Sequence, residues 1–139
     1  MSLAVERMAE SAARRVACVS VLLYALALAA EVLPGWRGWR VLLSGWRESL
    51  MAGADPRVAF GWLANPLLWA SWVLVFRSAS GGAAVLAALA VLLGSGVHFG
   101  TRIAANGVTL SMPHLGAGYW LWLAGLLVAL LAALLGLRR

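Results

Sequence analysis

Residues 60–76 carry no charged side chain and contain three tryptophans and one Asn65-Pro66 step. Three further apolar segments cover residues 16–33, 83–99 and 119–137. A helix needs about 20 mostly apolar residues to cross the hydrocarbon core of a bilayer, and about 17 suffice. The four segments therefore predict an all-α, polytopic membrane protein with four transmembrane helices, built as a single membrane domain over residues 1–139.

The composition supports a lipid environment. The chain is 63% hydrophobic and only 12% charged, whereas soluble domains have roughly 25% charged residues. So few charges cannot cover a surface that faces water. In a bilayer the outer surface can be apolar as long as the backbone is hydrogen-bonded internally, as it is in helices.

All eleven basic residues are arginines, and the net charge is +6. They are dispersed near the ends of the apolar segments, which argues against nucleic acid as a partner and favours anionic lipid head groups. The arginines closest to the predicted spans lie on the side that carries both termini: Arg14, Arg15, Arg77, Arg138 and Arg139. This bias predicts that both termini lie in the cytoplasm.

The first segment has two interpretations. Arg14-Arg15, the apolar run and Ala27-Leu28-Ala29 are typical of a signal peptide and its cleavage site. The apolar run is longer than a usual signal core, so we expect an uncleaved span. We expect the polar stretch over residues 1–15 to form a short helix at the membrane surface. Glu31, near the far end of the span, is expected to reach interfacial water or an arginine. Cys18, the only cysteine, is expected to be a small buried residue.

The connection over residues 34–59 contains a helical pattern. Trp39, Leu43, Trp46 and Leu50 recur at spacings of four, three and four, which places them on one helix face. This predicts an interfacial amphipathic helix over residues 38–52, although packing under the bundle is an alternative. Three arginines beside it are candidate contacts for anionic lipid head groups: Arg37, Arg40 and Arg47.

Asn65-Pro66 allows two geometries for the second span. Asn65 can be an N-cap with Pro66 in the first helical position, or one continuous helix can kink at Pro66. Transporter folds place binding sites at broken spans, but a plain cap or kink is the simpler interpretation.

His98, Arg102 and Asn106 follow one another at intervals of four residues. They would form a polar stripe if the third helix continued, although Gly100 and Gly107 weaken a helix there. A solvated helix end is the simpler interpretation. The residues that could line a polar site or a ligand path are Glu31, Asn65, His98 and Arg102.

The sequence contains no signature of catalysis. The predicted spans contain no pair of carboxylates for acid–base chemistry, and no Cys/His cluster has metal-ligand spacing. A phosphate loop, a nucleophile elbow and a His-Glu-Xaa-Xaa-His motif are all missing from the sequence. We therefore expect neither enzymatic activity nor a cofactor or metal.

Two stretches carry a resemblance: residues 62–67, Trp-Leu-Ala-Asn-Pro-Leu, and residues 116–124, Gly-Ala-Gly-Tyr-Trp-Leu-Trp-Leu-Ala. They resemble small uncharacterised four-helix bacterial inner-membrane proteins. In that group a Gly-Trp step also precedes the second span, as Gly45-Trp46 does here. The resemblance implies the four-helix layout and a place in a bacterial inner (cytoplasmic) membrane. It implies no activity, substrate or catalytic residue.

We expect a non-enzymatic accessory, scaffold or assembly subunit whose partners are membrane lipids and another membrane protein or copies of itself. Small residues that suit close helix contacts motivate this expectation: Gly94, Gly96, Gly116, Gly118 and Gly125. One alternative is a small oligomeric channel or transporter lined by the four polar candidates. Another is a lipid-binding factor or membrane enzyme that uses His98, Arg102 and the first connection.

Overall fold

The computed structural model describes residues 3–50, 53–106 and 108–137. Its helices are α1 (Leu3–Ala29), α2 (Gly38–Ser49), α3 (Pro56–Gly61), α4 (Ala64–Phe76), α5 (Ser80–Gly96), the 3-10 turn η1 (Val97–Phe99) and α6 (Ala117–Leu137). Its strands are β1 (Glu31–Leu33), β2 (Trp36–Arg37), β3 (Arg102–Ala105) and β4 (Val108–Ser111). The all-α class is confirmed, with two short antiparallel hairpins added, β1–β2 and β3–β4.

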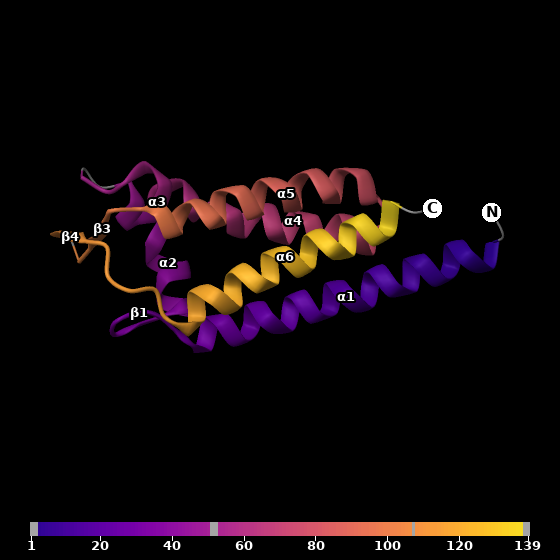
Figure 1. Cartoon of the computed structure of the whole chain (residues 1–139), viewed down its shortest axis with the longest axis horizontal. Helices are drawn as coiled ribbons and strands as arrows, with labels where there is room; N and C mark the ends of the chain where they lie inside the picture. Colours follow the sequence, from indigo (N-terminus) through magenta and orange to yellow (C-terminus); the bar gives the residue numbers. More distant parts are fainter. Residues whose placement is uncertain (1–2, 51–52, 107, 138–139) are drawn as a thin grey trace.

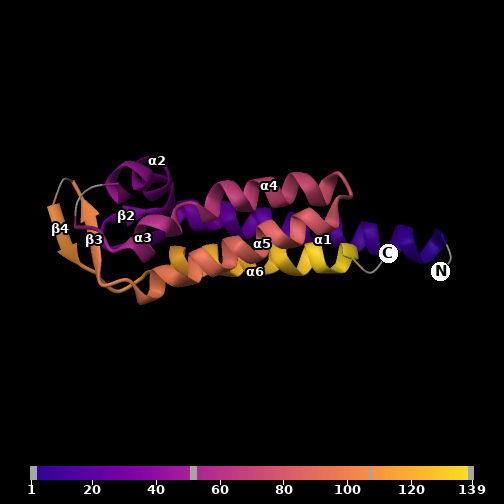
Figure 2. The same ribbon diagram turned by 90° about the horizontal axis from the view of Figure 1, so that it is seen from above.

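Four helical segments are long and apolar enough to cross a membrane: Leu3–Ala29, Pro56–Phe76, Ser80–Phe99 and Ala117–Leu137. They form one elongated bundle (Figure 1). The start of α1, the end of α6 and the α4–α5 turn lie at one end of it. The two hairpins and α2 lie at the opposite end and are called the cap below (Figure 2).

The first helix differs from its predicted bounds. Instead of a surface helix followed by a span over residues 16–33, α1 runs without interruption from Leu3 to Ala29. Its alanine-rich start favours a helix, and Arg14 and Glu10 form an ion pair one turn apart. Glu31 then lies in β1, because the chain turns back through Gly35, whose φ is +76°.

Of the two geometries expected at Asn65-Pro66, the N-cap at Asn65 does not occur, because Asn65 is already helical. The second segment breaks earlier, at Trp62–Leu63, so that Leu63 is the N-cap of α4 and Asn65 lies in its first turn. Pro66 has no N–H to donate to the carbonyl of Trp62. The backbone N–H and the side-chain amide of Asn65 both donate to that carbonyl instead, at 3.1 and 2.9 Å.

The polar stripe that His98, Arg102 and Asn106 would form on a continued third helix does not exist, because the helix ends before Arg102. α5 ends at Gly96, and Gly100 is extended with φ −69° and ψ 146°. Arg102 therefore begins β3, and Asn106 lies in the β3–β4 turn with φ +53°. A helix forms in the region where the interfacial helix was predicted over residues 38–52: α2 begins at Gly38 and ends at Ser49, while residues 51–52 lie outside the described part.

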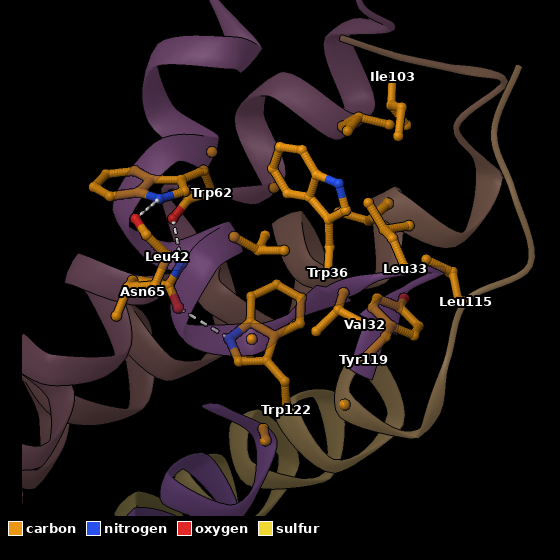
Figure 3. A pocket seen from close by; sticks show the side chains of 18 of the residues that line it. Val32, Leu33, Trp36, Leu42, Trp62, Asn65, Ile103, Leu115, Tyr119 and Trp122 are labelled. Atoms are coloured by element: carbon orange, nitrogen blue, oxygen red, sulfur yellow. Dashed lines mark hydrogen bonds between the residues drawn. The ribbon is translucent and has the colours of Figure 1, made fainter. Parts of the chain in front are cut away.

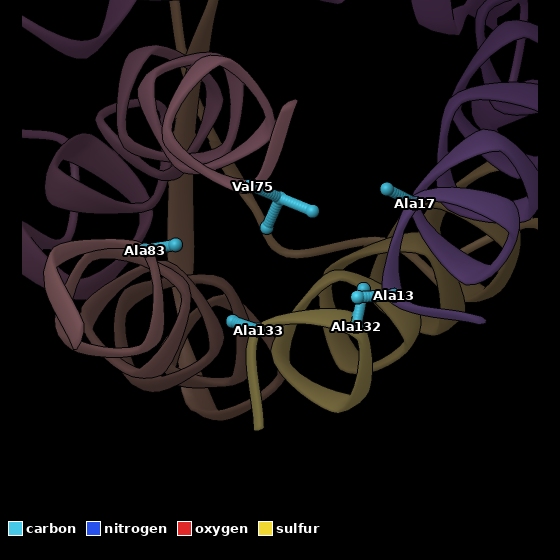
Figure 4. Packing of buried hydrophobic residues seen from close by; sticks show 6 residues of the cluster. All are labelled: Ala13, Ala17, Val75, Ala83, Ala132 and Ala133. Carbon is cyan, nitrogen blue, oxygen red and sulfur yellow. The ribbon is translucent and has the colours of Figure 1, made fainter. Parts of the chain in front are cut away.

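The core is built from small side chains at the terminal end of the bundle and larger ones near the cap. Figure 4 shows the first group, in which alanines of α1, α5 and α6 surround Val75. The second group centres on Leu68, Leu126 and Tyr24. Cys18 does not belong to either group: it is exposed on α1, so the expectation that it is buried was wrong. α1 makes most of its contacts with α6.

Candidate functional site

The bundle end under the cap contains a partly open, apolar pocket with a cavity volume of about 140 Å³. Side chains from α1, the cap, α3, α4 and α6 point into it (Figure 3). Its walls include three tryptophans and two tyrosines: Trp36, Trp62, Trp122, Tyr24 and Tyr119. Ligand sites are concave and mainly apolar with a few polar groups that fix orientation, and this pocket has that character.

Asn65 lies at the bottom of the pocket and is buried. Its side-chain oxygen accepts hydrogen bonds from the hydroxyl of Tyr24 at 3.1 Å and from the indole N–H of Trp122 at 3.0 Å. Its amide nitrogen donates to the carbonyl of Trp62. One amide thus joins α1, α4 and α6. Because its oxygen and nitrogen are both used in these hydrogen bonds, the interior of the pocket is mainly apolar.

α2 forms the lid of the pocket. Its inner face carries Gly38, Val41, Leu42 and Gly45, which line the cavity. The indole N–H of Trp62 donates to the carbonyl of Leu42 at 3.0 Å and ties the lid to the second span.

Glycine is required where the lid meets α1. A Cβ atom on Gly38 would lie 2.1 Å from the carbonyl oxygen of Ala27, and this oxygen belongs to the backbone and cannot rotate away. The close approach also places the backbone N–H of Gly38 2.9 Å from the carbonyl of Ala30.

Asp55 fastens the β3–β4 hairpin to the bundle. Its carboxylate caps α3 by accepting the backbone N–H of Arg57 at 2.9 Å, and it accepts both the backbone N–H and the hydroxyl of Thr101 at 3.0 Å. The backbone N–H groups of Arg57 and Thr101 hold the pKa of the Asp55 carboxyl below its usual value. The guanidinium of Arg57 donates to the carbonyl of Phe99, and the hairpin brings the buried Ile103 to the pocket wall.

A shallow groove lies on the outside of the same lid, between the β1–β2 hairpin and α2. It is lined by Trp36, Arg37, Arg40 and Ser44, with Glu48 and Asn106 among its other polar residues. The guanidinium carbon of Arg40 lies 4.2 Å from the centroid of the Trp36 ring, a cation–π contact. Trp36 and Glu48 line both the groove and the pocket.

The four polar candidates of the sequence do not converge. Asn65 lies in the pocket, whereas the carboxylate of Glu31 accepts the backbone N–H of Gly35 in the β1–β2 turn. His98 packs its ring against Phe99 and Trp120, with centroids 5.3 and 5.4 Å away. Arg102 is exposed on β3.

Sequence reasoning missed the pocket as a whole. In the sequence, Tyr119 and Trp122 stood out within residues 116–124, the stretch that carries the resemblance. In the structure the hydroxyl of Tyr119 donates to the carbonyl of Gly94 and its ring is buried. Among the head-group candidates, Arg37 and Arg40 share the groove, and Arg47 lies outside its lining.

Among the described residues, no group of three or more His, Cys, Asp or Glu side chains is placed to hold a metal. The chain matches no family model, no curated protein and no solved structure. The pocket and the groove are therefore interpreted from their own chemistry.

Proposed function

We propose that this chain is a four-span integral membrane protein of a bacterial inner membrane that works by binding, without catalysis. The observation that carries the proposal is the apolar pocket between the bundle and its lid. The ligand is a small apolar molecule or the apolar end of a lipid. A cavity of about 150 Å³ lined by apolar side chains is large enough for a ring such as benzene, and this one measures about 140 Å³.

The outer surface of the bundle supports the membrane part of the proposal. Large apolar side chains are exposed on its helices, among them Leu22 at 63%, Leu92 at 67% and Leu131 at 50%. Lipid is the solvent in which such a surface is stable. We place both termini in the cytoplasm, which puts the cap and its pocket at the opposite surface.

A role as an accessory or assembly subunit is compatible with binding. However, the space beside most of the glycines that motivated this role is filled by other residues of the same chain. A Cβ on Gly94 would meet Leu126 at 2.5 Å, and one on Gly118 would meet Val32 at 2.8 Å. Of the five glycines, Gly96 alone has open space beside it. A partner would therefore contact other surfaces.

The structure gives no support to the channel alternative, because the four polar candidates do not line a common path. Of Glu31, Asn65, His98 and Arg102, Asn65 alone lines the pocket, and its amide is already hydrogen-bonded to three partners. The same separation leaves His98 and Arg102 without a shared site for an enzyme.

Two leucines of the lid allow a matched test. Leu42 lines the pocket, whereas Leu50, at the end of α2, lines neither the pocket nor the groove and is 80% exposed. Leu42→Trp should fill the cavity, and Leu50→Trp makes the same chemical change outside both sites. The protein is purified from its native membrane in mild detergent and weighed intact by native mass spectrometry.

The proposal expects wild type and Leu50→Trp to carry a bound apolar adduct that Leu42→Trp lacks. Thermal unfolding of both variants checks that they are folded. Equal adducts in both variants would overturn the assignment of the pocket. So would a wild-type protein that carries no adduct and also binds no added alkyl probe. An adduct that proves to be a second polypeptide would establish the accessory role instead.

A further inference from the structure

The groove and the pocket share a wall, and this relationship points to the class of ligand. Trp36 has one surface toward the apolar cavity and carries the guanidinium of Arg40 over its ring. Arg37 and Arg40 are both exposed in the groove next to it. An apolar site thus lies beside a cationic site, with a single aromatic side chain lining both.

We infer that the ligand is an anionic amphiphile with one alkyl chain, whose head is a phosphate or a carboxylate. The inference rests on the proposed function of the pocket and adds the head-group site. The end of the chain occupies the pocket beneath α2, the following methylenes pass Trp36, and the head binds Arg37 and Arg40. A guanidinium presents a planar fork of N–H donors that fits a phosphate or carboxylate in a bidentate way.

The charge balance of the groove favours an anion. Its lining contains two arginines and one acidic residue, Glu48. Glu48 also reaches the pocket lining, so it lies on the inner side of the groove. The hydroxyl of Ser44 lies beside the arginines and donates to the carbonyl of Arg40, which holds it at the groove.

The orientation of the lid fits the same ligand. α2 runs across the axis of the bundle in one view and is seen nearly end-on after a 90° turn (Figures 1 and 2). Its outer stripe of Trp39, Leu43, Trp46 and Leu50 is between 50% and 80% exposed. A helix of this kind lies in the interface plane, which brings the groove to the level of lipid head groups.

The test compares three probes that separate the head from the chain: dodecyl phosphate, dodecanol and inorganic phosphate. The protein is placed in nanodiscs of phosphatidylcholine, a zwitterionic lipid. The two alkyl probes carry a diazirine near the chain end, and the crosslinked residues are identified by mass spectrometry. Inorganic phosphate enters as a competitor, which distinguishes a site for free phosphate from a site for an amphiphile.

The variants separate the two halves of the site. Arg37→Gln with Arg40→Gln removes the cationic site, and Leu42→Trp blocks the pocket. Arg47→Gln is the matched control, because Arg47 is on the same helix but outside the groove lining. Exposed ion pairs are individually weak, so two of them should give dodecyl phosphate about a fivefold to tenfold preference over dodecanol.

We expect crosslinks at pocket residues, the stated preference in wild type and Arg47→Gln, and equal binding of both alkyl probes in the double arginine variant. Equal binding of the two probes by wild type would overturn the head-group assignment while the pocket function stands. Crosslinking that Leu42→Trp leaves unchanged would overturn the pocket itself. Displacement of dodecyl phosphate by millimolar inorganic phosphate would show a site for free phosphate and would also contradict the inference.

Discussion

The side-chain oxygen of Asn65 accepts the indole N–H of Trp122 at 3.0 Å and so joins α4 to α6 beneath the pocket. The same oxygen accepts the hydroxyl of Tyr24. Three helices therefore meet at a single amide, whose hydrogen bond with Tyr24 is buried and whose hydrogen bond with Trp122 is partly buried.

Replacement of Asn65 by leucine should destabilise the fold by about 1–3 kcal/mol, because the hydroxyl of Tyr24 and the indole N–H of Trp122 lose their acceptor. Unfolding in detergent, followed by circular dichroism, gives the free energy. Ser95→Ala is the control, since that hydroxyl bonds only within its own helix, to the carbonyl of Leu92. In the Asn65→Leu background, Trp122→Phe should cost less than in wild type, and full additivity would contradict the coupling.

Gly38→Ala should loosen the lid. The added Cβ would overlap the carbonyl oxygen of Ala27, and a shift of backbone in a packed region costs roughly 1–3 kcal/mol. Gly96→Ala makes the same chemical change where nothing lies within 4 Å, and it should be neutral or slightly stabilising. Thermal unfolding of the two variants checks this, and an equal effect on both would mean that α2 does not approach α1 so closely.

Asp55 should make the stability of the cap depend on pH. Its pKa in the folded state is lowered by the backbone N–H groups of Arg57 and Thr101, while the unfolded value is about 3.9. Its contribution is therefore fully present above the unfolded value and is lost as the pH falls through the folded pKa. Between pH 7 and pH 3, the melting temperature of wild type should fall more steeply than that of Asp55→Asn. Parallel curves would show that the carboxylate does not hold the hairpin.

Cys18 offers a test of membrane insertion. It is exposed near the middle of α1, so in a bilayer it should face lipid, which a charged, water-soluble reagent does not enter. In spheroplasts a charged thiol reagent should leave Cys18 unmodified until detergent is added. The variant Ser111→Cys in a Cys18→Ala background should react at once, because β4 is exposed in the cap. Rapid labelling of Cys18 would contradict insertion, and protection of Ser111→Cys would contradict the proposed orientation.

The apolar segments could be predicted because a helix of that length and composition is a local property of the sequence. α6 begins at Ala117, two residues before its predicted start at Tyr119. The turn chemistry could not be predicted so well. An interval of four residues from His98 to Arg102 fits a helix, and only the extended conformation of Gly100 places Arg102 in a strand.

The pocket could not be predicted from local patterns, because it depends on which residues meet. Trp36, Asn65 and Trp122 lie far apart in the sequence and line one cavity. Asn65 was singled out for its place beside a proline, and its partners were not foreseen. The amphipathic pattern of α2 was recognised. The role of its inner face, where Leu42 and Gly45 line the pocket, depends on the residues packed beneath α2 and could not be predicted from that pattern.

The pairing of α1 with α6 has a consequence for biosynthesis. The hydroxyl of Ser20 donates to the carbonyl of Gly125, and α1 packs mainly on α6. Of the four candidate spans, the first to be synthesised thus has its main neighbour in the last. If the spans insert as proposed, the face of α1 around Ala17 and Ser20 has its partner in the bundle only once α6 has been made. The bundle can therefore close only after α6 is present.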